Sequence, residues 1–164
     1  MNLFPNGLLA DAEVLLQACR HADLRIATAE SCTGGLIAAC LSEIPGASHV
    51  LECGLVTYSN AAKTELLGVP AEMIRARGAV SAEVAEAMAV GALARAHADV
   101  AVSATGIAGP GGGTVEKPVG LVFLGAARRG QAPVHERHLF PGDRGAIRLA
   151  TVAAGIALLR RMLG

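Results

Sequence analysis

The segment Val100-Ala101-Val102-Ser103-Ala104 is a nearly continuous apolar run, and it leads directly into the glycine-rich stretch TGIAGPGGG at residues 105–113. A short apolar run without polar alternation is typical of a strand that is buried on both faces. This segment therefore predicts an inner strand of a layered α/β fold.

Strand-like and helix-like patterns alternate on both sides of this segment. The strands are predicted at residues 25–29, 51–57, 100–104, 119–126 and 134–140, the last of these being more polar and edge-like. Helices are predicted at residues 8–19 and 71–77, and from Ser59 or Asn60 to Gly68. Another begins somewhere in residues 30–35 and ends at about residue 42. Two more begin at Ser81 and at Asp143, the latter continuing to the end of the sequence. The alternation, closed by a hairpin, predicts an α/β fold: a three-layer α/β/α sandwich on a mixed, mostly parallel sheet. We expect one domain over residues 1–164.

Composition argues against several classes of function. The chain has 14 basic and 14 acidic residues and only 2% aromatic residues, so it has neither the basic field nor the stacking platforms of a nucleic-acid-binding protein. The apolar run at residues 149–159 is too short to span a bilayer, and residues 1–7 lack the basic leader of a signal peptide. We therefore expect a cytoplasmic protein without a membrane partner.

The small apolar side chains and the cysteines lead to two further expectations. With 52% apolar residues and few aromatics, alanine-rich helix faces should also be buried, which favours a homo-oligomer, with a dimer as the first choice. The four cysteines, Cys19, Cys32, Cys40 and Cys53, lack metal-type spacing, so we expect reduced and mostly buried thiols.

Three unusual segments begin where predicted strands end: residues 30–35, 58–63 and 105–117. In an α/β sheet, ligands bind beyond the carboxyl ends of the strands. We therefore expect these segments to converge on one site.

Lysine is rare in this chain, and Lys63 lies in one of the three segments. The chain has twelve arginines but only two lysines, Lys63 and Lys117, so a retained lysine suggests a need for an amine that can lose its proton. If Ser59 or Asn60 caps the following helix, Lys63 lies in its first turn, where the helix dipole favours the neutral amine. A neutral Lys63 could accept a proton from Ser31 or from water, with Tyr58 orienting or relaying it. The alternative is an exposed lysine on a surface helix.

The other two segments leave more than one interpretation open. Ser31 stands at a strand-to-helix junction whose backbone N–H groups suit a phosphate or an oxyanion, but it could equally be an ordinary helix cap. The glycine-rich loop precedes a strand and so is no Walker loop; it could form an anion-binding nest with Lys117 or be a flexible loop. Arg144 could clamp a phosphate or merely decorate the surface. The histidines lie apart from acidic clusters, so neither a metal nor another cofactor is expected.

Taken together, the motifs resemble the CinA carboxy-terminal domain family, whose standalone members are nicotinamide mononucleotide deamidases. The matching stretches are AESCTGG at residues 29–35, VTYSNAAK at 56–63, GAVS at 78–81, TGIAGP at 105–110, GG at 112–113, KPVG at 117–120 and FPGDR at 140–144. The resemblance covers nearly the whole chain from about residue 8. The amino-terminal domain of full-length members, with its pyrophosphatase activity, is expected to be missing.

The resemblance implies a metal-independent amidohydrolase that converts nicotinamide mononucleotide to nicotinate mononucleotide and ammonia. Carried over, the catalytic group would be Ser31, Tyr58 and Lys63, with Ser31 as nucleophile and Lys63 as base. The substrate-binding group would be Thr33, Gly34, Gly35, Asn60, Thr105, Gly106, Gly109, Gly112, Gly113, Lys117 and Arg144. Whether an acyl-enzyme forms stays open at this point. The competing interpretations are a non-catalytic nucleotide-binding or regulatory domain and an amidase for another small nucleotide.

Overall fold

The structure, a computed structural model, describes residues 3–164; residues 1 and 2, part of the segment tested above for a leader, lie outside the described residues. Helices and strands alternate as expected. The elements are α1 (Asn6–Ala22), β1 (Ile26–Glu30), α2 (Leu36–Ser42), the 3-10 helix η1 (Ala47–His49), β2 (Leu51–Val56), α3 (Asn60–Leu67), α4 (Ala71–Arg77), α5 (Ala82–Arg95), β3 (Val100–Gly106), β4 (Leu121–Arg128), β5 (Val134–Leu139) and α6 (Arg144–Met162).

The five strands form one mixed sheet in the order β2-β1-β3-β4-β5. Strand β1 pairs in parallel with both β2 and β3, whereas β4 is antiparallel to β3 and to β5. Four of the five strands therefore run in one direction and only β4 opposes them. The mixed, mostly parallel sheet predicted from the sequence is confirmed.

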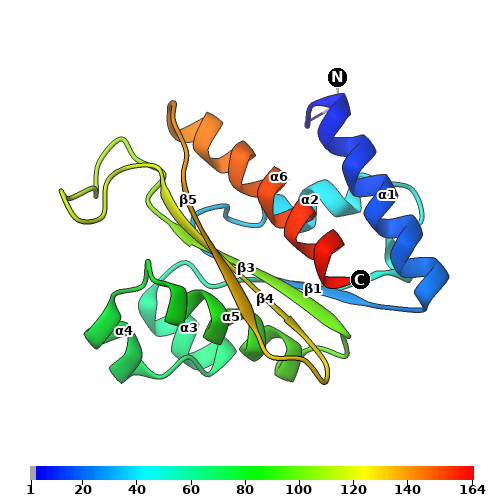
Figure 1. Cartoon of the computed structure of the whole chain (residues 1–164), viewed down its shortest axis with the longest axis horizontal. Coiled ribbons are helices and arrows are strands. Elements are labelled where there is room, and N and C mark those ends of the chain that lie inside the picture. The colour runs from blue at the N-terminus through cyan, green and yellow to red at the C-terminus, as the bar shows by residue number, and fades with distance from the viewer. Residues whose placement is uncertain (1–2) are drawn as a thin grey trace.

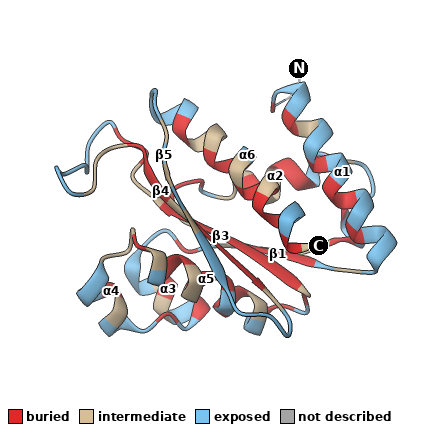
Figure 2. Cartoon of the chain, viewed as in Figure 1, coloured by how far each residue is buried: buried red, intermediate tan, exposed pale blue. Residues whose placement is uncertain are grey.

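Helices cover both faces of the sheet, which gives the three predicted layers. Helices α1, α2 and α6 lie on one face and α3, α4 and α5 on the other (Figure 1). Every residue of β1 is buried, while the edge strand β5 has only exposed and half-buried residues (Figure 2). The apolar run at residues 100–104 is buried throughout, so the central strand was placed correctly from its composition.

One helix begins later than the sequence indicates. Helix α2 begins at Leu36 and not within residues 30–35, because Gly34 and Gly35 have φ values of +59° and +98°. These left-handed conformations cannot continue a right-handed helix. Residues 31–35 therefore form a turn between β1 and α2, and Ser31 lies in that turn.

Candidate active site

A cavity of about 310 Å³ lies at the carboxyl ends of β1, β2 and β3. All three segments singled out in the sequence contribute to its lining. The predicted site residues that line it are Ser31, Tyr58, Asn60, Lys63, Thr105, Gly106, Gly109, Gly112 and Arg144. The parallel strands bring these segments together, because their carboxyl ends share one edge of the sheet.

Ser31 and Lys63 meet in this cavity although they are 32 residues apart in the chain. The Nζ atom of Lys63 lies 3.0 Å from the Oγ atom of Ser31. Ser59 is the N-cap of α3, its hydroxyl accepting from the Ala62 backbone N–H, so Lys63 lies at the start of the helix as predicted. The turn after β1 and the first turn of α3 thus present a hydroxyl and an amine to each other.

Lys63 is the largest side chain in the described chain that is almost fully buried, with 1% of its surface exposed. Burial lowers the pKa of its amine below the ordinary value of 10.5, because a charged ammonium loses its hydration there. The direction agrees with the sequence analysis, but the leading cause is burial and not the helix dipole.

The neighbours of the Lys63 amine are all uncharged. Besides Ser31, the Nζ atom contacts the carbonyl oxygens of Thr57 at 2.9 Å and Tyr58 at 3.3 Å. A neutral amine has two N–H donors and one lone pair. In the structure the Lys63 Nζ atom donates to the Ser31 Oγ atom; in the neutral amine the two carbonyls take both donors, and the lone pair faces the Ser31 hydroxyl. The site therefore places a serine hydroxyl in direct contact with a buried amine.

The hydroxyl of Tyr58 contacts neither Ser31 nor Lys63 in this structure, and its part in catalysis stays a prediction. The hydroxyl accepts a hydrogen bond from Nη2 of Arg144 at 3.0 Å, and the Tyr58 side chain is largely exposed. It is the backbone carbonyl of Tyr58, not the phenol, that contacts Lys63 and lies 3.5 Å from the Ser31 Oγ atom. The phenol thus forms part of the cavity wall.

Arg144 connects the rim of the cavity to the glycine-rich loop. Its Nη1 atom donates to the carbonyl oxygen of Gly109 at 2.7 Å while Nη2 holds Tyr58. Gly109 has a φ of +78°, which favours glycine, and a Cβ there would lie 2.6 Å from the side chain of Val119. The loop is therefore folded tightly back, with a guanidinium at the mouth of the cavity.

Several predicted substrate-binding residues lie outside the cavity lining: Thr33, Gly34, Gly35, Gly113 and Lys117. The ammonium of Lys117 donates instead to the carbonyl oxygens of Arg77 at 2.7 Å and Val80 at 2.9 Å. It ties the end of the glycine-rich loop to the connection between α4 and α5. The charge of Lys117 therefore faces backbone carbonyls and not a substrate anion in the cavity.

The helix N-terminus that the sequence offered to a phosphate is occupied by the chain's own carboxylate. The backbone N–H groups of Ile37 and Ala38 donate to the carboxylate of Glu30 at 2.8 and 3.0 Å. Because these donors are satisfied, a substrate phosphate at this helix end would have to displace the buried side chain of Glu30. Arg144 and the loop at residues 106–112, unlike this helix end and Lys117, line the cavity and are the candidates for contact with a substrate anion.

Sequence reasoning did not identify six lining residues and one supporting carboxylate. The additional lining residues are Cys32, Ala79, Val80, Ile107, Ala108 and Gly111. Glu30, which supports the turn, carried a usable signal: it is a carboxylate at the end of a buried apolar strand, where an ionised group needs dedicated partners. Ala79 and Val80 carry no such signal, since small apolar residues in a helix connection are ordinary.

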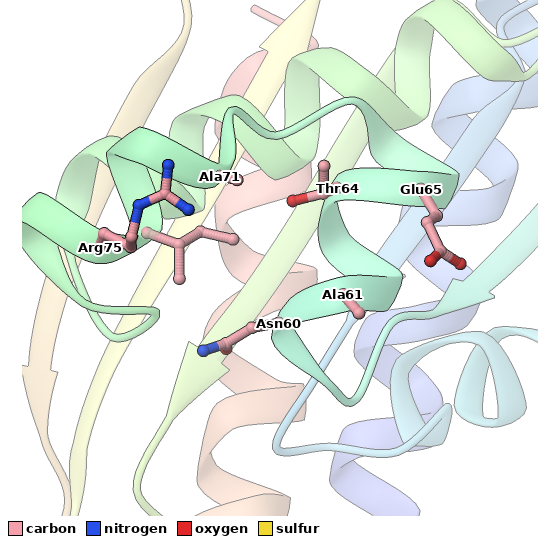
Figure 3. Close-up of a pocket in the computed structure, with 7 residues that line it drawn as sticks. Asn60, Ala61, Thr64, Glu65, Ala71 and Arg75 are labelled. Atoms are coloured by element: carbon pink, nitrogen blue, oxygen red, sulfur yellow. The ribbon is translucent and has the colours of Figure 1, made fainter.

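A second cavity of about 330 Å³ lies between α3 and α4 (Figure 3). It shares Asn60 with the first cavity and is otherwise lined by Ala61, Thr64, Glu65, Ala71, Ile74 and Arg75. It contains neither Ser31 nor Lys63. We therefore place the candidate active site in the first cavity.

The described part of the chain lacks metal-type side-chain clusters, candidate membrane-spanning helices and paired cysteines. Within residues 3–164, no three histidine, cysteine or acidic side chains gather where they could hold a metal ion. None of the helices in this part of the chain has the length and apolar content needed to cross a membrane. All four cysteines are free, three of them buried and Cys53 half-buried, as expected.

Comparison with known proteins shows extensive similarity at the level of sequence. A family model described as the CinA C-terminal domain matches residues 10–163. A CinA-like protein from Mycolicibacterium vanbaalenii is 56% identical over 158 residues, which are 96% of this chain and 37% of that protein. A CinA-like protein from Akkermansia muciniphila is 53% identical over 146 residues, which are 89% of this chain and 35% of that protein. The chain thus spans about a third of the length of these curated relatives.

Solved structures agree with the fold. The competence/damage inducible protein CihA from Agrobacterium tumefaciens superposes with a TM-score of 0.98 at 45% identity, covering 100% of both chains. A competence-damaged protein (CinA) superfamily protein from Escherichia coli superposes with a TM-score of 0.91 at 32% identity, covering 98% of this chain and 94% of the other.

Proposed function

This chain belongs to the CinA C-terminal domain family, and from that premise we propose that it is a serine amidohydrolase that deamidates nicotinamide mononucleotide. One observation carries the proposal: the buried amine of Lys63, with a lowered pKa, lies 3.0 Å from the Ser31 hydroxyl inside a cavity. A hydroxyl next to an unprotonated base is the arrangement that activates a nucleophile.

The proposed reaction proceeds through an ester on Ser31. The Lys63 amine takes the hydroxyl proton, and the Ser31 oxygen attacks the carboxamide carbon. The Lys63 ammonium then gives the proton to the carboxamide nitrogen, which leaves as ammonia. Water then attacks the ester with Lys63 again accepting a proton, which releases the carboxylate and restores the serine. The net change is the hydrolysis of one carboxamide, with no oxidant, metal or cofactor required.

The rim of the cavity supports a nucleotide monophosphate as the substrate class. Arg144 stands at the mouth beside the glycine-rich loop, and a guanidinium can bind a phosphate through two parallel hydrogen bonds. Tyr58 is the one aromatic side chain of the chain's four that lines the cavity, so it is the available surface for a pyridine ring.

The test is ammonia release from nicotinamide mononucleotide by purified, chelator-treated protein. We expect turnover in the unaltered protein and a loss of at least about 1000-fold in Ser31→Ala, since removing the nucleophile removes covalent catalysis. Lys63→Arg should lose a similar factor, because arginine keeps the charge but supplies no neutral base. Near-normal turnover by either variant would contradict the mechanism.

A substrate panel distinguishes the competing functions. Nicotinamide riboside, which lacks the phosphate, should react much more slowly than the mononucleotide if Arg144 binds the phosphate. Ammonia from another nucleotide carboxamide alone would indicate a different amidase. Binding of the mononucleotide without ammonia release would indicate a regulatory module.

A further inference from the structure

Glu30 is a fully buried carboxylate that immediately precedes the proposed nucleophile but does not line the cavity. Four donors surround it. Its Oε1 atom accepts from the Thr33 hydroxyl at 2.7 Å and the Ile37 N–H at 2.8 Å. Its Oε2 atom accepts from the Thr28 hydroxyl at 3.0 Å and the Ala38 N–H at 3.0 Å.

These contacts hold both ends of the turn that contains Ser31. On one side, Glu30 belongs to β1, and the Ser31 N–H continues the strand pairing by donating to the carbonyl oxygen of Ala104 at 2.9 Å. On the other side, the carboxylate accepts hydrogen bonds from the Thr33 hydroxyl and from the N–H groups of Ile37 and Ala38 in the first turn of α2. Ser31 is therefore fixed between two anchored points.

The same residue also holds the other half of the proposed dyad through its backbone. The carbonyl oxygen of Glu30 accepts from the Thr57 N–H at 2.9 Å, and the carbonyl oxygen of Thr57 is an acceptor for the Lys63 amine. Glu30 is thus linked to Ser31 along the chain and to Lys63 through one intervening residue.

We infer that Glu30 is a positioning residue whose carboxylate holds the Ser31 hydroxyl at the Lys63 amine; the inference rests on the proposed function for its chemistry. Glu30 acts as neither acid nor base, since its carboxylate is outside the cavity and accepts four hydrogen bonds. A carboxylate bonded directly to Lys63 would stabilise the ammonium and impair the base. The Glu30 carboxylate instead accepts hydrogen bonds from the start of α2.

The experiment measures the reactivity of Ser31 directly, with a fluorophosphonate probe and mass spectrometry, beside ammonia release. Glu30→Gln keeps the shape but turns one acceptor oxygen into a donor that faces two other donors. Misplacing a reacting group by about 1 Å costs on the order of 100-fold in rate. We therefore expect labelling of Ser31 and kcat to fall by about that factor, with KM changed much less.

Ser103→Ala is the matched control for the loss of a buried hydrogen-bonding group. The Ser103 hydroxyl is fully buried between Ala85 and Gly125, outside the cavity lining, and its loss should leave the labelling rate unchanged. Thr33→Val removes one donor to Glu30 without altering the charge, and it should slow labelling while Thr33→Ser restores it. This pair tests the inference even if Glu30→Gln does not fold.

The outcomes separate the inference from the proposed function. Labelling of Ser31 without ammonia release would refute the deamidase but leave the inference standing, provided that the Glu30 and Thr33 variants label slowly. Labelling of a folded Glu30→Gln variant at the normal rate would overturn the inference. A folded, unaltered protein that never labels at Ser31 would overturn it as well.

Discussion

At the scale of single residues, turnover should follow the protonation of one buried amine. Burial lowers the pKa of Lys63 below 10.5, and only the neutral amine can accept the proton of Ser31. We therefore predict that kcat/KM rises with pH through this lowered pKa and reaches a plateau before pH 10.5. A pH–rate profile from acidic to alkaline buffers, with the stability of the protein checked at each pH, measures it.

The control for this profile is Tyr58→Phe, which removes the only phenol but leaves Lys63 in place. Its ascending limb should lie at the same pH as that of the unaltered protein. An activity that stays constant over the whole range, or a limb that moves in this variant, would show that Lys63 is not the titrating base.

Tyr58→Phe should also retain most of its activity. Its hydroxyl contacts Arg144 and no atom of Ser31 or Lys63, whereas the carbonyl oxygen that contacts Lys63 is unaffected by the substitution. Losing a partly exposed hydrogen bond of about 1 kcal/mol should lower kcat/KM by roughly fivefold. Steady-state kinetics with the mononucleotide measure the change. A loss of more than 1000-fold would instead restore the phenol as a proton relay.

The proximity of Ser31 and Lys63 could be predicted from sequence, but the direction of individual side chains could not. Both residues follow strands of one parallel sheet, and that topology alone brings them to one edge. The phenol of Tyr58 and the ammonium of Lys117 turn toward partners that other segments supply, Arg144 and two backbone carbonyls. No local pattern encodes such partners.

At the scale of elements, the position of Lys63 depends on close packing between α3 and α5. A Cβ atom at Gly91 in α5 would lie 2.0 Å from the carbonyl oxygen of Leu67 in α3. Gly91→Ala should therefore push the two helices apart, lowering the free energy of unfolding by about 1–3 kcal/mol. Because α3 carries Lys63, ammonia release should fall as well. Chemical denaturation and the ammonia assay measure the two effects.

Gly7→Ala is the matched control for this substitution. A Cβ atom at Gly7 in α1 meets no atom within 4 Å, so alanine only restricts the unfolded chain there. It should stabilise the protein by about 0.5–1 kcal/mol and leave turnover unchanged. Equal stability effects of the two substitutions would refute the packing argument.

The elements themselves were largely predictable because their signals are local. Ser59, Ser81 and Asp143 each accept a hydrogen bond from the first turn of a helix, as capping residues do. The start of α2 was placed too early because Gly34 and Gly35 can be helical in principle. Their left-handed conformations become evident only when the turn closes on Glu30.

At the scale of the whole molecule, the burial of titratable side chains makes the free energy of unfolding depend on pH. Burial raises the pKa of Cys19, Cys32 and Cys40 from 9.0 to about 11. The unfolded chain therefore releases these thiol protons at a lower pH than the folded protein. The contribution of these protonated thiols to the free energy of unfolding is complete below pH 9.0 and is lost as the pH rises to about 11.

Lys63 has the opposite effect on stability. Its pKa is lowered in the folded protein, so the unfolded chain binds its proton more tightly, and the free energy of unfolding rises with pH until 10.5. Each of the three shifted thiols contributes on the order of 2 kcal/mol to the fall, and only one amine opposes it. We predict a net fall in the free energy of unfolding between neutral pH and pH 11, measured by urea denaturation under reducing conditions.

Two variants separate the opposing contributions to this fall. Cys40→Ala removes one buried thiol and should make the decline with pH shallower, whereas Lys63→Met removes the rising contribution and should make it steeper. Comparing the slopes, and not the absolute stabilities, cancels the cost of altered packing in each variant. If both variants lose stability with pH in parallel with the unaltered protein, the buried thiols and the buried amine are not the groups whose titration couples this fold to pH.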